Sequence, residues 1–283
     1  MKKMITKTLL ASAVATVCAF SANIASAQTF PDFNISEASV VGALPNNFTA
    51  DKITGNYVEV ITFNGAPASG SFDVSLRWNA GQFVANDGRD PVASQLGGIA
   101  ASNYGLYALY KGSGTYTNNG TETTFNFTPG GSLSLFSDAG NNTTFVQPTN
   151  GAAGFTTGNA GDDVLLASGV PTSGQGTLNP SLSTCPAVGS AATSGINCGS
   201  FGTSSSLALT GAGSSYFVAP NPFYQLSFQS GQLNNFAPTG TQVINGSLDV
   251  IFSGSSAVPE PASVALIGLG LVGLALSRRR KQA

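Results

Sequence analysis

The side chains that could do chemistry in this chain are carboxylates. Its 283 residues include no histidine, which excludes a Ser-His-Asp triad, a Cys-His nucleophile and any zinc site built on imidazole. Two acidic pairs remain, Asp87 with Asp90 and Asp162 with Asp163, and a facing pair of carboxylates is what a glycosidase needs. Gly, Asn and Pro flank both pairs, which is typical of turns. We therefore expect them to shape loops, and we predict that the protein is not an enzyme.

A calcium site is a second use for the segment NDGRDP. Asn86, Asp87 and Asp90 offer hard oxygen atoms from one loop, which suit Ca²⁺. Their spacing lacks the full EF-hand ligand pattern. Apart from this candidate, the sequence predicts no metal and no cofactor.

Two cysteines, Cys185 and Cys198, lie in the part of the chain that follows Ala27. Their spacing is much longer than the C-x-x-C motif of a redox enzyme. In an exported chain a pair of lone cysteines is most often oxidised, and we predict a disulfide between them.

The N-terminal segment 1–27 is typical of a secretory signal peptide. Lys2, Lys3 and Lys7 precede an apolar stretch from Leu9 to Phe20, which is shorter than the roughly 20 residues of a membrane span. The small-residue pattern that ends at Ala27 predicts cleavage between Ala27 and Gln28. Export through the Sec pathway and removal of the segment 1–27 by signal peptidase follow.

The C-terminal segment 258–283 has three parts. Pro259, Glu260 and Pro261 come first, an apolar run over 264–276 follows, and the basic cluster at 278–281 closes the segment. We expect the run to be a short hydrophobic helix in contact with the membrane. The positive-inside rule keeps the basic cluster cytoplasmic and places the body outside. The members of that cluster are Arg278, Arg279, Arg280 and Lys281.

This tail resembles the PEP-CTERM sorting signal of Gram-negative bacteria. The resemblance implies an exosortase, a membrane protease that recognises Pro259, Glu260 and Pro261 and then releases or re-attaches the protein at the cell surface. A plain membrane anchor with a proline-rich turn is the alternative.

The body, residues 28–257, alternates apolar and polar residues with a period of two, which predicts β-strands. In the segment 71–78, Phe72, Val74, Leu76 and Trp78 share one face, and we expect Trp78 to pack in the core. Tyr104 and Tyr110 are in phase in another segment while Tyr107 is opposite, so one side of that strand is expected to be exposed.

Many short strands separated by turns predict an all-β fold, an antiparallel β-sandwich-like domain with long Gly/Ser/Thr/Asn loops. One domain is favoured, although two smaller ones are compatible with the length. Residues 138–203 have little strand signal and are expected to form a loop-rich insertion.

Charge argues against nucleic acid as a partner. Charged residues make up 8% of the chain, against about 25% in an ordinary domain. The basic residues gather at the two ends, which leaves four basic and twelve acidic residues between 28 and 257. An acidic body is not attracted to nucleic-acid phosphates.

The start of the mature body also resembles flocculation-associated PEP-CTERM proteins. The matching segments are Phe30 to Glu37, Phe48 to Phe63, Gln82 to Val84 and Gln95 to Gly97. The resemblance implies a non-enzymatic protein of the cell surface or extracellular matrix that promotes flocculation or biofilm formation with extracellular polysaccharide. The alternatives are a lectin-like module with one glycan pocket, a carboxylate-dependent polysaccharide hydrolase, and self-assembly into fibres.

Overall fold

The computed structural model describes residues 30–97, 103–185 and 197–253. The predicted signal peptide, its cleavage site at Ala27 and Gln28, the Pro-Glu-Pro motif, the helix 264–276 and the basic cluster 278–281 lie outside these residues. Within the described ranges, no helix has both the length and the apolar character needed to cross a membrane.

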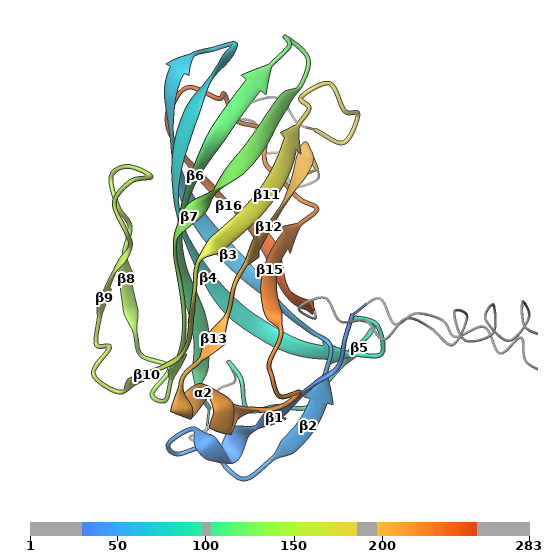
Figure 1. The fold of residues 1–283 in the computed structure, drawn as a ribbon, viewed down its shortest axis with the longest axis vertical. Helices are drawn as coiled ribbons and strands as arrows, with labels where there is room; N and C mark the ends of the chain where they lie inside the picture. The colour runs from blue at the N-terminus through green and yellow to red at the C-terminus, as the bar shows by residue number, and fades with distance from the viewer. Residues whose placement is uncertain (1–29, 98–102, 186–196, 254–283) are drawn as a thin grey trace, which may run out of the picture.

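The centre of the molecule is a closed antiparallel barrel of eight strands (Figure 1). In the order in which they neighbour one another, the strands are β11 (Pro171–Leu178), β12 (Gly199–Ser205), β15 (Gln225–Ser230), β16 (Gly240–Ser253), β3 (Lys52–Ala66), β4 (Ser69–Ala85), β6 (Gly105–Asn118) and β7 (Thr123–Asp138). Pairing of β7 with β11 closes the ring.

The all-β prediction is confirmed, but the strands form a barrel where the sequence predicted a sandwich. The closure depends on β7, whose two halves have different partners. Residues 123–127 pair with β11, and residues 133–138 pair with β10 (Asp163–Gly169). Both architectures bury alternate residues of each strand, so a period of two does not distinguish them. The deciding contact joins segments that are far apart in the sequence and has no local signal.

The two halves of β7 meet at a bend that requires glycine. Gly130 and Gly131 have φ angles of +117° and +97°, in the region that glycine enters without steric cost. A Cβ atom on Gly131 would lie 2.1 Å from the carbonyl oxygen of Lys111 on the neighbouring strand. The register of β6 against β7 shifts between Lys111 and Ser113, beside this bend.

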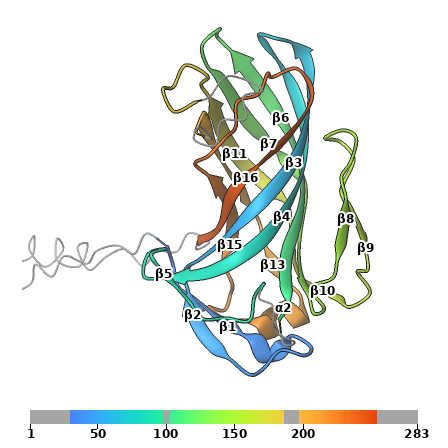
Figure 2. The ribbon, with the colours of Figure 1, turned by 180° about the vertical axis from the view of Figure 1, so that it is seen from behind.

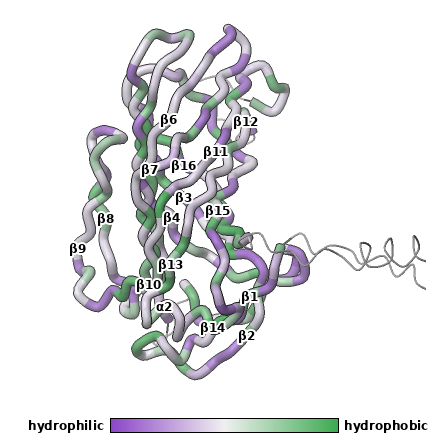
Figure 3. The backbone as a smooth tube through the Cα atoms, viewed as in Figure 1, coloured by the Kyte–Doolittle hydropathy of each residue, from purple (hydrophilic) through white to green (hydrophobic). Residues whose placement is uncertain are grey.

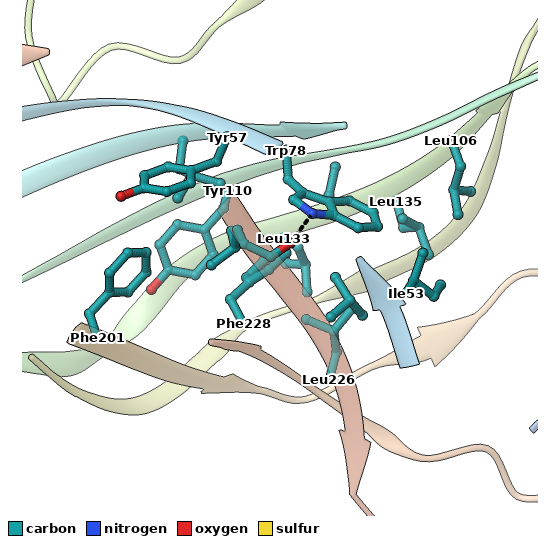
Figure 4. Packing of buried hydrophobic residues seen from close by; sticks show 14 of the residues in the cluster. Ile53, Tyr57, Trp78, Leu106, Tyr110, Leu133, Leu135, Phe201, Leu226 and Phe228 are labelled. Carbon is teal, nitrogen blue, oxygen red and sulfur yellow. Dashed lines mark hydrogen bonds between the residues drawn. The ribbon is translucent and has the colours of Figure 1, made fainter. Parts of the chain in front are cut away.

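The barrel interior is filled by the apolar residues that the alternation assigns to one face. Trp78 is fully buried, and its Nε1 donates a 2.8 Å hydrogen bond to the carbonyl oxygen of Leu248 on β16, two strands away. The centroid of its ring lies 6.2 Å from that of Phe228 (Figure 4). The core role predicted for Trp78 therefore agrees with the structure. In Figure 3 hydrophobic residues recur along the barrel strands, and the loop at β5 (Asp90–Pro91) is mostly hydrophilic.

A small second sheet covers one end of the barrel (Figures 1 and 2). The elements of this cap are β1 (Phe33–Ser36), the 3-10 helix η1 (Glu37–Ser39), β2 (Asn47–Ala50), the helix α2 (Gly211–Tyr216) and β14 (Phe217–Ala219). Phe33 joins the cap to the barrel, because its ring centroid lies 4.9 Å from that of Phe252 on β16 and 6.1 Å from that of Phe217. These rings belong to the same buried cluster as the barrel core.

Residues 139–162, which we call the arm, leave the barrel after β7 and return at β10. The arm contains the hairpin β8 (Thr144–Val146) and β9 (Thr156–Gly158), which lies outside the barrel (Figures 1 and 2). Its far end touches the wall, where the backbone N–H of Gly151 donates a 2.9 Å hydrogen bond to Oγ1 of Thr62. A Cβ atom on Gly151 would lie 1.9 Å from the carbonyl oxygen of Asp73, so glycine permits this close approach.

The region 138–203 is richer in strands than the sequence indicated. It contains β8, β9, β10, β11 and the start of β12, and β11 and β12 are barrel strands. The segment of β11, PTSGQGTL, has few apolar side chains and reads as a loop by pattern alone. It forms a strand because β7 and β12 pair with its two edges.

The predicted disulfide is present in this region. Cys185 and Cys198 are bonded, with their Cα atoms 4.5 Å apart. Cys198 is fully buried immediately before β12, so the bond ties the preceding loop to the barrel wall. The strand β13 (Ala208–Leu209) pairs with the edge of β10 that faces away from β7.

Candidate functional site

The residues of the predicted calcium loop form and stabilise the turn between β4 and β5. Asn86 and Asp87 both have φ of +57°, a conformation that Asn and Asp adopt more readily than other side chains. Nδ2 of Asn86 donates a 2.9 Å hydrogen bond to Oδ2 of Asp90. Oδ1 of Asp87 accepts instead from the backbone N–H of Phe30, at 3.4 Å. The Asp87 and Asp90 carboxylates thus have separate partners, and calcium binding by this loop stays a prediction.

A different acidic cluster lies at the base of the arm. Asp138 ends β7 and Asp163 begins β10, and the two residues are directly opposite each other in the antiparallel ladder. Asp162 precedes Asp163. Each of the three offers one carboxylate oxygen, and these oxygens all lie within 4.8 Å of one another. The sequence singled out Asp162 and Asp163 as a pair, but Asp138 joins them only through the pairing of β7 with β10.

Hydrogen bonds from the start of the arm orient these three carboxylates. The backbone N–H of Thr143 donates to Oδ2 of Asp138, and the backbone N–H of Gly140 donates to Oδ2 of Asp162, both at 2.8 Å. The hydroxyl of Thr143 donates to Oδ1 of Asp163 at 2.8 Å. Backbone and side-chain donors from one short segment therefore fix the geometry of the cluster.

Tyr107 lies next to the acidic cluster. Its hydroxyl donates a hydrogen bond to Oδ2 of Asp163. The ring stacks on Phe136 with centroids 5.0 Å apart, and Phe145 of the arm meets it edge-on at 4.9 Å. Burial raises the pKa of Tyr107, and the hydrogen bond to Asp163 raises it further.

The prediction that one side of the tyrosine-rich strand is exposed is wrong, because the arm covers Tyr107. Tyr107 does point away from the core, opposite in phase to Tyr104 and Tyr110, but the arm covers it and leaves it 4% exposed. The guanidinium of Arg77 lies under the same arm, 4.6 Å from the centroid of the Phe145 ring. Burial lowers the pKa of Arg77.

A hollow opens between the cluster and the barrel wall. It is lined by Asn79, Ala80, Gly97, Gly105, Leu106, Tyr107, Asp138, Asn141, Thr143 and Phe145. Oδ1 of Asp138 and Oδ1 of Asn79 are both buried without a hydrogen-bond partner among the described residues. Two buried acceptor oxygens, for which the described part of the chain supplies no donor, thus line one small space.

A second hollow lies over the cap. It is lined by Asn34, Ile35, Ser36, Asn47, Phe48, Thr49 and Val218. Amide and hydroxyl groups share this surface with apolar atoms, among them the exposed side chain of Val218. The Phe48 ring packs against Phe83, with centroids 5.0 Å apart. The hydroxyl of Thr49 donates a 2.9 Å hydrogen bond to Oδ1 of Asn34 across β1 and β2, which orders part of the polar lining. We call this surface the cap groove.

Two buried glutamates were missed by the sequence analysis. Glu59 is 5% exposed and, together with Phe125 and Phe236, lines a narrow apolar space inside the barrel. Its burial raises its pKa to about 8. The alternation of β3 gives the signal, because Glu59 is in phase with the buried Tyr57 and Ile61.

Glu37, in the cap, is also fully buried, and neighbouring groups donate hydrogen bonds to its carboxylate. Its carboxylate accepts bonds from Nδ2 of Asn46, from the backbone N–H and Nε2 of Gln95, and from the hydroxyl of Tyr104, at 2.8 to 3.0 Å. Four donors to one carboxylate make it a structural centre of the cap.

Comparison with known proteins identifies the end of the chain. Residues 257–281 match the family model of the PEP-CTERM protein-sorting motif. The chain carries a PEP-CTERM sorting signal. The matched residues include Pro259, Glu260 and Pro261, the apolar run and the basic cluster that the sequence analysis assigned to it. No curated protein and no solved structure matches the chain.

The PEP-CTERM signal determines the destination of the protein. It implies Sec export, processing by an exosortase and targeting to the cell surface of a Gram-negative bacterium. The barrel, the cap groove and the acidic cluster at the base of the arm are therefore features of an exported protein.

Proposed function

We propose that this protein is a non-enzymatic component of the cell surface or extracellular matrix that promotes flocculation or biofilm formation by associating with extracellular polysaccharide. The PEP-CTERM signal at residues 257–281 carries the proposal, because it places the barrel outside the cell. The resemblance of the first mature segments to flocculation-associated PEP-CTERM proteins supports the same role.

The cap groove is the surface that suits a neutral polysaccharide best. Sugar hydroxyl groups both donate and accept hydrogen bonds, and Asn34, Asn47 and Thr49 offer both kinds of partner along one face. The exposed side chain of Val218 adds an apolar contact for the C–H groups of a sugar ring. Contacts of this kind are individually weak, and many copies of the protein on one cell would supply avidity.

A lectin-like module with one defined glycan is the second candidate, and the same groove favours it. The two candidates differ in selectivity. A matrix protein binds the bulk polysaccharide of its own cells through many weak contacts, whereas a lectin gives a single strong signal on a glycan array. Hydrolysis of the polysaccharide with release of reducing ends, abolished by substitution of Asp87 or Asp90, would support an enzyme instead.

Co-sedimentation of the purified protein with polysaccharide extracted from its own cells tests the proposal. We expect a saturable bound fraction, reduced at least fivefold in the double variant Asn34→Ala, Asn47→Ala. Gln175→Ala is the matched control, because Gln175 is an exposed amide on β11 of the barrel wall, and it should bind as wild type does. Equal binding by all three proteins would exclude the cap groove, and no binding by wild type would exclude the proposal.

A further inference from the structure

The base of the arm has the dimensions of a cation site. Calcium binds oxygen at about 2.3 to 2.6 Å, so two oxygens on one ion are at most about 5 Å apart. The carboxylate oxygens of Asp138, Asp162 and Asp163 lie within 4.8 Å of one another. Each pair of these oxygens is therefore close enough to share one ion.

The carboxylates at this place form no ion pair with a basic residue that the structure describes. Arg77, under the same arm, has its guanidinium against the Phe145 ring instead. Like charges directly opposite each other in an antiparallel ladder are destabilising, and Asp138 faces Asp163 in this way. Among residues 30–97, 103–185 and 197–253, the ion pair found is Lys52 with Asp249, on the barrel wall. The three carboxylates of the cluster thus repel one another, and no basic side chain of those ranges forms an ion pair with them.

Two buried oxygens add evidence that is independent of the clustering. Asp138 is 3% exposed, and its Oδ1 has no hydrogen-bond donor among the described residues. Oδ1 of Asn79 lines the same hollow and is likewise buried without a donor from the described ranges. A buried acceptor without a partner destabilises the fold, and a metal ion is a partner that satisfies carboxylate and amide oxygens together.

We propose that Asp138, Asp162 and Asp163 bind one divalent cation at the base of the arm, with calcium preferred to magnesium. Three carboxylates provide between three and six oxygen atoms. An amide oxygen of Asn79 or Asn141, both of which line the hollow, and water complete the six to eight ligands of calcium. Magnesium requires a near-ideal octahedron at shorter distances, and a site assembled from two chain segments does not enforce one.

The ion would fasten the arm to the barrel. Asp138 is the last residue before the arm and Asp162 is its final residue, so one ion bridges the points where the chain leaves and returns. Asp162 is exposed, which gives the ion a path from solvent. The cap groove is elsewhere on the molecule, so the inference is independent of the proposed function.

Isothermal titration of the exported protein with CaCl₂ and with MgCl₂, after purification in EDTA and buffer exchange, tests the site. We expect one calcium ion per chain with a Kd between about 10⁻⁵ and 10⁻³ M, and weaker binding of magnesium. At ten times the Kd, calcium should raise the melting temperature by roughly 3 to 6 °C.

Two variants locate the ion. Asp162→Asn keeps an oxygen to accept the hydrogen bond from Gly140, removes one charge at an exposed position, and should weaken calcium binding at least tenfold. Asp90→Asn removes the same charge from an exposed position in the β4–β5 turn, the alternative calcium site, and on this proposal it should bind as wild type does. No heat and no thermal shift at millimolar calcium would overturn the proposal. So would a loss of binding in Asp90→Asn with Asp162→Asn unaffected.

Discussion

The hydroxyl of Tyr104 donates a 3.0 Å hydrogen bond to the buried carboxylate of Glu37, which joins the barrel to its cap. Both residues are fully buried, and the hydroxyl of Tyr216, from the helix α2, lies 2.6 Å from that of Tyr104. Burial and the neighbouring tyrosine raise the pKa of Tyr104, so its hydroxyl keeps its proton and acts as a donor. The cap is thus attached to the barrel by a polar contact as well as by aromatic packing.

Removal of this hydroxyl should weaken the whole domain. We expect Tyr104→Phe to lower the free energy of unfolding by about 1.5 to 3 kcal/mol, because a hydrogen bond to a buried charged group is lost. Denaturant unfolding followed by circular dichroism measures the effect. Tyr224→Phe is the control, since that hydroxyl donates to the neutral carbonyl oxygen of Asp32 at an exposed site. A cost for Tyr104→Phe no larger than that for Tyr224→Phe would contradict the account of the cap.

Glu59 should make the stability depend on pH. Burial raises its pKa to about 8 in the folded protein, against about 4.3 in an unfolded chain. Between these values the folded state binds more protons than the unfolded state, so stability falls as pH rises and levels off above pH 8. Glu59→Gln should therefore be more stable than wild type at pH 8.5, by about 3 to 5 kcal/mol.

Unfolding by denaturant at pH 5 and pH 8.5 tests this dependence. Glu122→Gln, in the loop between β6 and β7, is the control and should follow the wild-type pH profile. The interpretation fails when Glu59→Gln loses stability between the two pH values as steeply as wild type does.

The disulfide between Cys185 and Cys198 should stabilise the barrel at β12. The bond closes a loop with a sequence separation of 13, and chain-entropy arguments give about 3 kcal/mol for a loop of that length. The unreduced protein should contain no free thiol by mass spectrometry. Reduction should lower the melting temperature by roughly 6 to 12 °C, and the double variant Cys185→Ser, Cys198→Ser should melt with the reduced protein. Two free thiols in the exported protein would contradict the pairing.

Whether a strand residue faces the core was predictable where this depends only on the residues next to it in the sequence. Alternation in β4 places Trp78 on the buried face, and the structure agrees. The same rule would have located Glu59, whose phase in β3 is that of Tyr57, had a charged residue been accepted on a buried face. Local periodicity is sufficient in each of these cases, because a strand presents alternate residues to one side.

Features that depend on contacts between distant segments could not be predicted. Closure of the barrel requires β7 to pair with β11, whose glycine-rich sequence has no strand pattern of its own. Tyr107 has the phase of an exposed residue and is buried by the arm. The acidic cluster forms because β7 pairs with β10, which brings Asp138 to Asp163 although the whole arm separates them in the sequence.

The measurement that tests the central claim most directly is the settling of cells that lack this gene, beside the parent strain, with exported polysaccharide quantified in both. We predict that the mutant stays dispersed while its polysaccharide yield is unchanged, and that the full-length gene restores settling whereas a version ending before Pro259 does not. Settling of the mutant at the parental rate, with equal polysaccharide, would contradict a role in flocculation.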